Sequence, residues 1–107
     1  MSRAYTFAMR LSDHQRQLLK DHVVKVLGSD CELWLFGSRT DDTARGGDVD
    51  LLVRCHHPLE RKLLLAARLA ARAERLLDGR KVDLILIDPA TPTAPIHDAA
   101  LAHGVRL

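Results

Sequence analysis

Three aspartates carry the residue types that metal and phosphate chemistry needs. Asp48 and Asp50 lie two residues apart in the run DVDLLV, and Asp83 lies near the start of another apolar run, KVDLILI. Because side chains alternate across a strand, Asp48 and Asp50 are predicted to share one face while their apolar neighbours face a core. Neighbouring ionised carboxylates repel each other, so this arrangement needs a counter-charge, which a divalent cation supplies.

Magnesium is the cation that this donor set favours. Mg²⁺ takes a few carboxylate oxygens together with phosphate oxygens and water, rather than a full protein cage. If the strand of Asp83 pairs beside the strand of Asp50, the three carboxylates reach one metal cluster. Asp83 is then placed to accept the proton of an attacking hydroxyl.

A phosphate-binding turn is predicted directly after the first apolar strand, at Gly37 and Ser38. Glycine permits close backbone approach, and the amides of such a turn can point at anions. The Ser38 hydroxyl adds a donor, and Arg39 or Arg45 can offset the charge of a leaving pyrophosphate. No GK[ST] follows, so the segment is not a Walker A loop.

The elements that must position these residues follow from apolar periodicity, capping and turn signals. Together they predict an α/β (α+β) fold, a small mixed β-sheet packed by helices. In the long helix, one stripe is predicted to face the core: Leu63, Ala66, Ala70, Ala73 and Leu77. The predicted order is a helix at 12–27 closed by Gly28, a strand at 31–36, a polar loop at 39–47, a strand at 48–53, a helix from 59 to near 79, a strand at 81–87, a short helix at 96–102 and a terminal segment at 105–107.

Length and composition indicate one domain over residues 1–107, with 47% hydrophobic residues to fill a core. The net charge of +2 does not indicate nucleic acid as a partner, and no apolar run approaches the ~20 residues of a membrane span. Cys31 and Cys55 lie far apart without a CxxC pair, which predicts reduced thiols packed in a core and a cytoplasmic protein. Since the chain leaves little length for an acceptor-binding domain, a partner protein or a homodimer is expected to complete the site.

The remaining arginines and histidines are not predicted to take part in the chemistry. The arginines of the long helix are predicted to form its solvated face: Arg61, Arg68, Arg72 and Arg75. The six histidines show no ligand spacing such as HExxH, so they are predicted to be surface or packing residues.

The pattern Gly37-Ser38, nine intervening residues, Asp48-Val49-Asp50 and then Asp83 resembles the DNA polymerase β-like nucleotidyltransferase superfamily. The minimal stand-alone branch, MNT, is the most similar, over about Leu33 to Ile87. Many relatives have ten residues between the serine and the first aspartate, one more than here. The resemblance implies the polymerase β-like fold and the family's roles for these residues. In the family, the Gly-Ser turn binds the phosphates, and three carboxylates hold two Mg²⁺ while a nucleoside monophosphate is transferred from ATP or another nucleoside triphosphate.

Two kinds of partner follow from this resemblance. One is a HEPN-type helical toxin that is itself adenylylated, which makes this chain an antitoxin. The other is a helical substrate-binding subunit of a two-component transferase for a small molecule. Two other functions stay open: a non-catalytic nucleotide-binding module, and a metal-dependent glycosyltransferase that uses an Asp-x-Asp, which the short chain disfavours.

Overall fold

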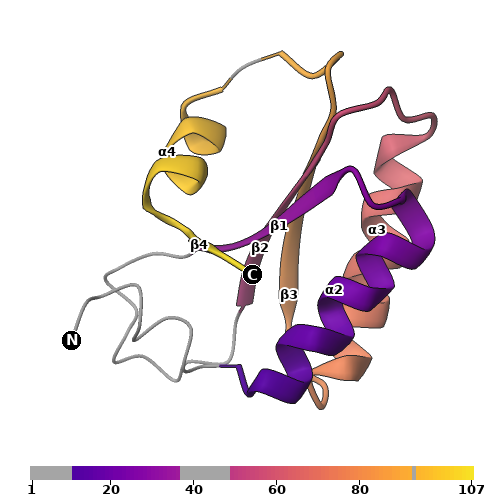
Figure 1. The fold of residues 1–107 in the computed structure, drawn as a ribbon, viewed down its shortest axis with the longest axis vertical. Coiled ribbons are helices and arrows are strands. Elements are labelled where there is room, and N and C mark those ends of the chain that lie inside the picture. Colours follow the sequence, from indigo (N-terminus) through magenta and orange to yellow (C-terminus); the bar gives the residue numbers. More distant parts are fainter. Residues whose placement is uncertain (1–10, 37–48, 93) are drawn as a thin grey trace.

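A computed structural model describes residues 11–36, 49–92 and 94–107, which form a sheet with helices on both faces (Figure 1). The elements are, in chain order, α2 (Asp13–Leu27), β1 (Cys31–Phe36), β2 (Val49–Cys55), α3 (Lys62–Leu76), β3 (Val82–Ile87), α4 (Pro95–His103) and β4 (Val105–Arg106). Within these ranges no helix combines the length and the apolar character needed to cross a membrane. The predicted α/β class with a mixed sheet is confirmed.

The sheet has the strand order β3-β2-β1-β4. Strand β1 is antiparallel to both β2 and β4, whereas β2 and β3 are parallel. A parallel pair needs a crossover connection, and α3 provides it between these two strands. Strand β4, which the sequence left as a terminal segment, adds a fourth strand along β1.

The main core lies between the sheet and the helices α2 and α3, on the right in Figure 1. Strand β2 contributes every second residue to it, as the alternation of a half-covered strand requires. Its most buried members are Val49, Leu51, Val53, Cys55, Leu69 and Leu77, each at most 2% exposed. A smaller cluster fills the opposite face, where α4 covers Leu52 and Ile87.

Helix α2 begins as the sequence predicts. The Ser12 hydroxyl accepts a hydrogen bond of 3.0 Å from the Gln15 amide, and the Gln15 side chain accepts one of 3.0 Å from the Ser12 amide. This reciprocal capping box satisfies two amides that a helix start otherwise leaves unpaired. The helix ends at Gly28, whose φ of 104° is a conformation that side-chain-bearing residues rarely adopt.

Helix α3 is shorter than predicted, Lys62–Leu76 instead of 59 to near 79. At its start Arg61 has a left-handed φ of 55°, so the helical conformation begins only after it. At its end Asp78 and Gly79 have φ values of 61° and 86°, which close the helix and turn the chain toward β3. Gly79 does mark the turn after the helix, as predicted, but the helix itself ends at Leu76.

The predicted apolar stripe of α3 is partly wrong. Leu63 is 89% exposed, while Leu69, Ala73 and Leu77 are at most 2% exposed. Ala66 and Ala70 are partly buried against the same core, so Leu63 alone leaves the predicted stripe, and Leu69 joins it. Helical spacing gives the period of a stripe, but the packing against the sheet decides which stripe is buried.

Candidate functional site

Asp50 and Asp83 meet on the sheet. They are direct partners in the parallel register of β2 and β3, so their backbones lie one strand spacing apart, about 4.8 Å. Their strand neighbours Val49, Leu51 and Val82 belong to the core below α2 and α3. Because side chains alternate, both carboxylates project from the other face, the one that carries α4. The predicted pairing of the Asp83 strand beside the Asp50 strand is confirmed.

The two strand starts are held by backbone and side-chain contacts from the neighbouring elements. The Val49 amide donates a 2.8 Å hydrogen bond to the Lys81 carbonyl. The Val82 amide donates one of 3.1 Å to Glu74, which lies in the last turns of α3. Both bonds sit one residue before an aspartate, so they fix where Asp50 and Asp83 leave the sheet.

The charge environment of this pair is acidic. Asp83 is exposed and Asp50 is half-buried. Within the described ranges, no lysine, arginine or histidine side chain forms an ion pair with Asp83. Like charges directly opposite each other on a sheet are destabilising, so the arrangement fits a group that brings positive charge. Two carboxylates beside each other are also a donor set that Mg²⁺ accepts.

The other predicted site residues lie outside the described residues. These are the phosphate-binding group and the first aspartate: Gly37, Ser38, Arg39 and Asp48, with Arg45 beside them in the sequence. In the sequence, Gly37 directly follows Phe36, the β1 partner of Asp50. The structure therefore brings together two of the predicted carboxylates, and the roles of the remaining residues stay predictions.

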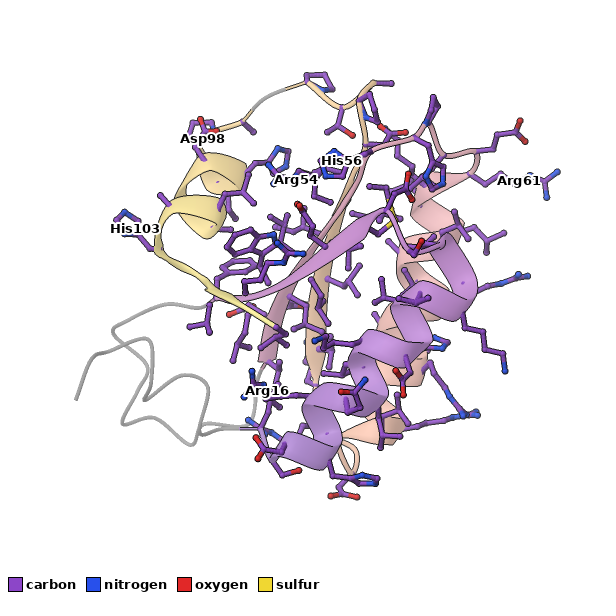
Figure 2. The ribbon with its side chains drawn as sticks, viewed as in Figure 1. Arg16, Arg54, His56, Arg61, Asp98 and His103 are labelled. Atoms are coloured by element: carbon purple, nitrogen blue, oxygen red, sulfur yellow. A yellow bond between two sulfur atoms is a disulfide. The ribbon has the colours of Figure 1, made fainter. Side chains whose placement is uncertain are left out.

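A second polar group occupies the same face at the opposite end of β1 and β2. Glu32 pairs with Arg54, with 2.7 Å from Nε and 2.6 Å from a terminal nitrogen to Oε1, and His56 Nε2 lies 3.4 Å from Oε2. Arg106 lies 3.8 Å from the same carboxylate and stacks over Trp34 at 5.9 Å. Figure 2 shows Arg54 and His56 on the α4 side of the sheet, whereas Arg61 points away from the molecule.

The pKa of Glu32 reflects these contacts. Burial raises it, but hydrogen bonds from Arg54 and His56 and the charges of Arg54 and Arg106 lower it by more, so the net pKa is below the usual value. The carboxylate is thus ionised and neutralised in place. This cluster links β1 to β2 and β4, and its one carboxylate is already neutralised by its partners.

Asp88 forms a third polar group, just after β3. Its carboxylate accepts hydrogen bonds from Lys62 Nζ at 2.9 Å, the Leu59 amide at 2.8 Å and the Thr91 hydroxyl at 2.9 Å. The Lys62 hydrogen bond first, then the Leu59 amide, hold the pKa of Asp88 far below its ordinary value against the opposing effect of burial. The network ties the start of α3 to the end of β3, and no local pattern in the sequence predicts it.

The cysteines correct one sequence expectation. Cys31 and Cys55 are partners in the antiparallel register of β1 and β2, with Cα atoms 4.1 Å apart, and their sulfurs form a disulfide. The prediction of two reduced thiols is therefore wrong for this structure, although their burial was expected. A separation of 24 residues carries no disulfide signal, because only the strand register places the two residues opposite each other.

His57 forms an ion pair that the sequence did not predict. Its Nδ1 lies 2.8 and 2.9 Å from the two carboxylate oxygens of Asp30, beside the disulfide. The hydrogen bond to His57 lowers the pKa of Asp30. No spacing motif reveals such a pair, because its members belong to different strand ends.

A hollow of about 220 Å³ lies elsewhere, between α2 and the edge formed by β1 and β4. Its lining includes Lys20, Val24, Leu33 and Arg106. Neither Asp50 nor Asp83 lines it.

Comparison with known proteins identifies a matching family model and several solved structures with a similar fold. The family model described as "Nucleotidyltransferase domain" matches residues 16–103, most of the chain. No curated protein matches.

Solved structures with a similar fold include a protein from Shewanella oneidensis, at 20% identity and a TM-score of 0.60 over 90% of this chain and 71% of that one. A second is from a complex of a tri-AMPylated Shewanella oneidensis HEPN toxin with an MNT antitoxin, at 22% identity and a TM-score of 0.54 over 85% and 70%. A third is from a toxin–antitoxin pair, MntA with a mutant HpeT, at 19% identity and a TM-score of 0.60 over 91% and 71%. At these identities the likeness concerns the fold, which agrees with the expected polymerase β-like fold.

Proposed function

The chain belongs to the nucleotidyltransferase domain family, and on that premise we propose that it transfers a nucleoside monophosphate, AMP from ATP, to an acceptor hydroxyl on a partner protein. The observation that carries the proposal is the register pairing of Asp50 with Asp83 on one face of the sheet. Two carboxylates on paired strand positions, without a basic partner for Asp83 in the described ranges, suit a site that binds a metal–nucleotide complex.

Asp50 and Asp83, with Asp48 two residues before Asp50 in the sequence, would hold Mg²⁺. Bound there together with nucleotide, two Mg²⁺ ions supply Lewis-acid polarisation and neutralise charge on the phosphates. The protein residues provide the rest. The Gly37-Ser38 turn binds the phosphate tail through backbone amides and the Ser38 hydroxyl, and Arg39 donates hydrogen bonds to the pyrophosphate that leaves.

Asp83 is the candidate general base. In the proposed reaction it accepts the proton of the acceptor hydroxyl, whose oxygen attacks the α-phosphorus. A bond forms between that oxygen and phosphorus, and the bond from phosphorus to the bridging oxygen of the β-phosphate breaks, which releases pyrophosphate. Positioning and charge stabilisation carry the rate of such phosphoryl transfers.

For the acceptor we propose a small helical HEPN-type toxin, which makes this chain an antitoxin. The support is that a protein with this fold is described as an MNT antitoxin in complex with a tri-AMPylated HEPN toxin. An inactive ribonuclease after AMP transfer would be the functional outcome. The alternatives are a two-component transferase and a homodimer. The test below distinguishes them by the molecule that receives the label.

The test is label transfer. The purified chain is incubated with Mg²⁺ and ATP labelled at the α-phosphate, alone and with the helical protein encoded beside its gene. Transfer to that protein supports the hypothesis that this chain is an antitoxin. Transfer to a small molecule supports the hypothesis that it is a subunit of a two-component transferase. Binding of ATP without any transfer would identify a non-catalytic module and overturn the proposal.

Site variants assign the residues. Asp50→Asn and Asp83→Asn should each reduce transfer by more than about a hundredfold, since loss of even an outer-shell partner of a metal site costs roughly 10–100-fold. Asp78→Asn is the matched control. It makes the same charge change at an exposed turn before β3, where asparagine tolerates the left-handed backbone. Equal activity in Asp83→Asn and Asp78→Asn would remove Asp83 from the site.

A further inference from the structure

Four side chains with the donor types of a transition-metal site converge at the opposite end of the sheet. They are Asp30, Cys31, Cys55 and His57, at the start of β1 and the end of β2. Cys31 Sγ lies 3.8 Å from Asp30 Oδ1, and His57 Nδ1 lies 2.8 Å from Asp30 Oδ2. One ligand atom each of Asp30, Cys31 and His57 fits within 4.8 Å of the others, and Cys55 is bonded to Cys31.

The backbone holds this group in place. Cys31 and Cys55 are opposite each other in the antiparallel register, so both sulfurs point to one face of the sheet. Gly28 closes α2 beneath the cluster with a φ of 104°, and a Cβ there would lie 3.5 Å from Asp30 Oδ1 and 3.9 Å from His57 Cε1. The cluster thus sits on rigid strand ends and a helix terminus, which is how a ligand set is pre-organised.

We propose that Asp30, Cys31 and His57 bind a zinc-type transition metal ion when the Cys31–Cys55 disulfide is reduced, with Cys55 as the fourth ligand. A carboxylate, an imidazole and two thiolates form the S₂NO donor set that suits tetrahedral Zn²⁺. Three of the four side chains already have their donor atoms together. Cys55 is bonded to Cys31 and becomes the second thiolate once that bond is broken.

The chemistry balances with a dithiol as reductant. The dithiol gives two electrons and two protons to the sulfur–sulfur bond, which becomes two cysteine thiols, and the dithiol is itself oxidised to a disulfide. Metal binding then displaces the thiol protons to solvent, because thiolates are the ligands. In the oxidised chain neither sulfur is a thiolate, so the disulfide and the metal site exclude each other.

This site is separate from the carboxylate pair. Cys55 follows Asp50 by five positions along β2, a span of about 16 Å along an extended strand. The two donor sets also select different ions, since Mg²⁺ prefers oxygen ligands while thiolate and imidazole suit zinc. Its test therefore does not depend on nucleotidyl transfer.

Cobalt is the probe, because Co²⁺ occupies zinc sites and absorbs light. The full chain is reduced with a dithiol, freed of reductant under argon and titrated with Co²⁺, and Zn²⁺ is then added in competition. We expect one Co²⁺ per reduced chain, with sulfur-to-cobalt charge-transfer absorption and tetrahedral d–d bands that Zn²⁺ abolishes. The oxidised chain should show neither. No binding by the reduced chain, or equal binding by the oxidised chain, would overturn the proposal.

Variants identify the ligands. Cys55→Ser, which has no disulfide to reduce, should bind Co²⁺ without reductant and with about half the charge-transfer intensity. His57→Asn should weaken Co²⁺ binding at least ~10-fold, and His56→Asn, one residue away and paired with Glu32, should not. Far-ultraviolet circular dichroism checks that each variant is folded. Unchanged affinity and spectrum in His57→Asn would contradict the assignment.

Discussion

The carboxylates at the two ends of the sheet have different neighbours. At the starts of β2 and β3, Asp50 and Asp83 stand side by side. At the other end three acids have a cationic or histidine partner: Asp30 with His57, Glu32 with Arg54, and Asp88 with Lys62. These partners neutralise the acids at that end, whereas Asp83 has no basic partner within the described ranges, and under the proposed function a bound cation supplies positive charge there. Residues that bind a ligand are commonly costly to the empty protein in this way.

Reduction of the disulfide should have the largest effect on the stabilising end. A cross-link over 24 residues restricts the unfolded chain, and loop entropy gives a contribution of about 3.5 kcal/mol. Denaturant unfolding of the oxidised and the reduced, metal-free chain measures it. Cys31→Ser should match the reduced chain and not respond to reductant. Identical midpoints in both redox states would show that this end does not depend on the cross-link.

Ligand binding should stabilise the acidic end. Mg²⁺ with a non-hydrolysable ATP analogue at 100 times its Kd should add about 2.7 kcal/mol to the free energy of unfolding, because it binds only the folded state. A thermal melt with and without ligand checks this. The double variant Asp50→Asn, Asp83→Asn should show no shift, and a chelator should abolish the wild-type shift. Equal shifts in the wild type and the double variant would place the ligand elsewhere.

Asp88 should make the free energy of unfolding depend on pH in the acid range. Because the folded pKa of Asp88 is depressed by Lys62 and the Leu59 amide, its stabilising effect is complete above the ordinary aspartate pKa of about 4 and is lost as pH falls toward the folded value. Asp88→Asn should lower the melting temperature by a few degrees at pH 7. The difference from wild type should shrink as pH falls below about 4.

Lys62→Met is the companion variant for this network. It keeps the aliphatic stem but removes the ammonium that lies 2.9 Å from Asp88. It should weaken the same pH dependence without abolishing it, since the Leu59 amide still binds the carboxylate. A constant difference between wild type and Asp88→Asn across the acid range would refute the assignment.

The smallest effect is expected at the acidic end without ligand. Asp83→Asn removes one of two adjacent like charges and should raise the free energy of unfolding by about 0.2–1 kcal/mol. Asp78→Asn, which lies outside the pair, should leave it nearly unchanged. Urea melts in the presence of a chelator measure both. A loss of stability in Asp83→Asn would mean that the carboxylate pair is already neutralised within the protein.

Local signals predicted much of the fold. The Ser12–Gln15 capping box set the start of α2, and alternation in DVDLLV correctly separated Asp50 from its core-facing neighbours. The boundaries of α3 were less accurate, because Arg61 and the Asp88 hydrogen bond to Leu59 act at its start. For the site, the strands of Asp50 and Asp83 were expected to pair, and the register of β2 with β3 confirms this, while the chemical roles of the two residues stay predictions.

By itself the sequence determined which segments alternate or repeat and which residue types stand at their ends, because these properties depend on neighbours along the chain. Only the tertiary structure decided which distant residues meet. The register of β2 with β3 joins Asp50 to Asp83, the register of β1 with β2 joins Cys31 to Cys55, and the return of the chain after β3 brings Asp88 to Lys62. A shift of one residue in either register would turn these side chains to opposite faces. Packing of the whole core, rather than any local spacing, fixes that choice.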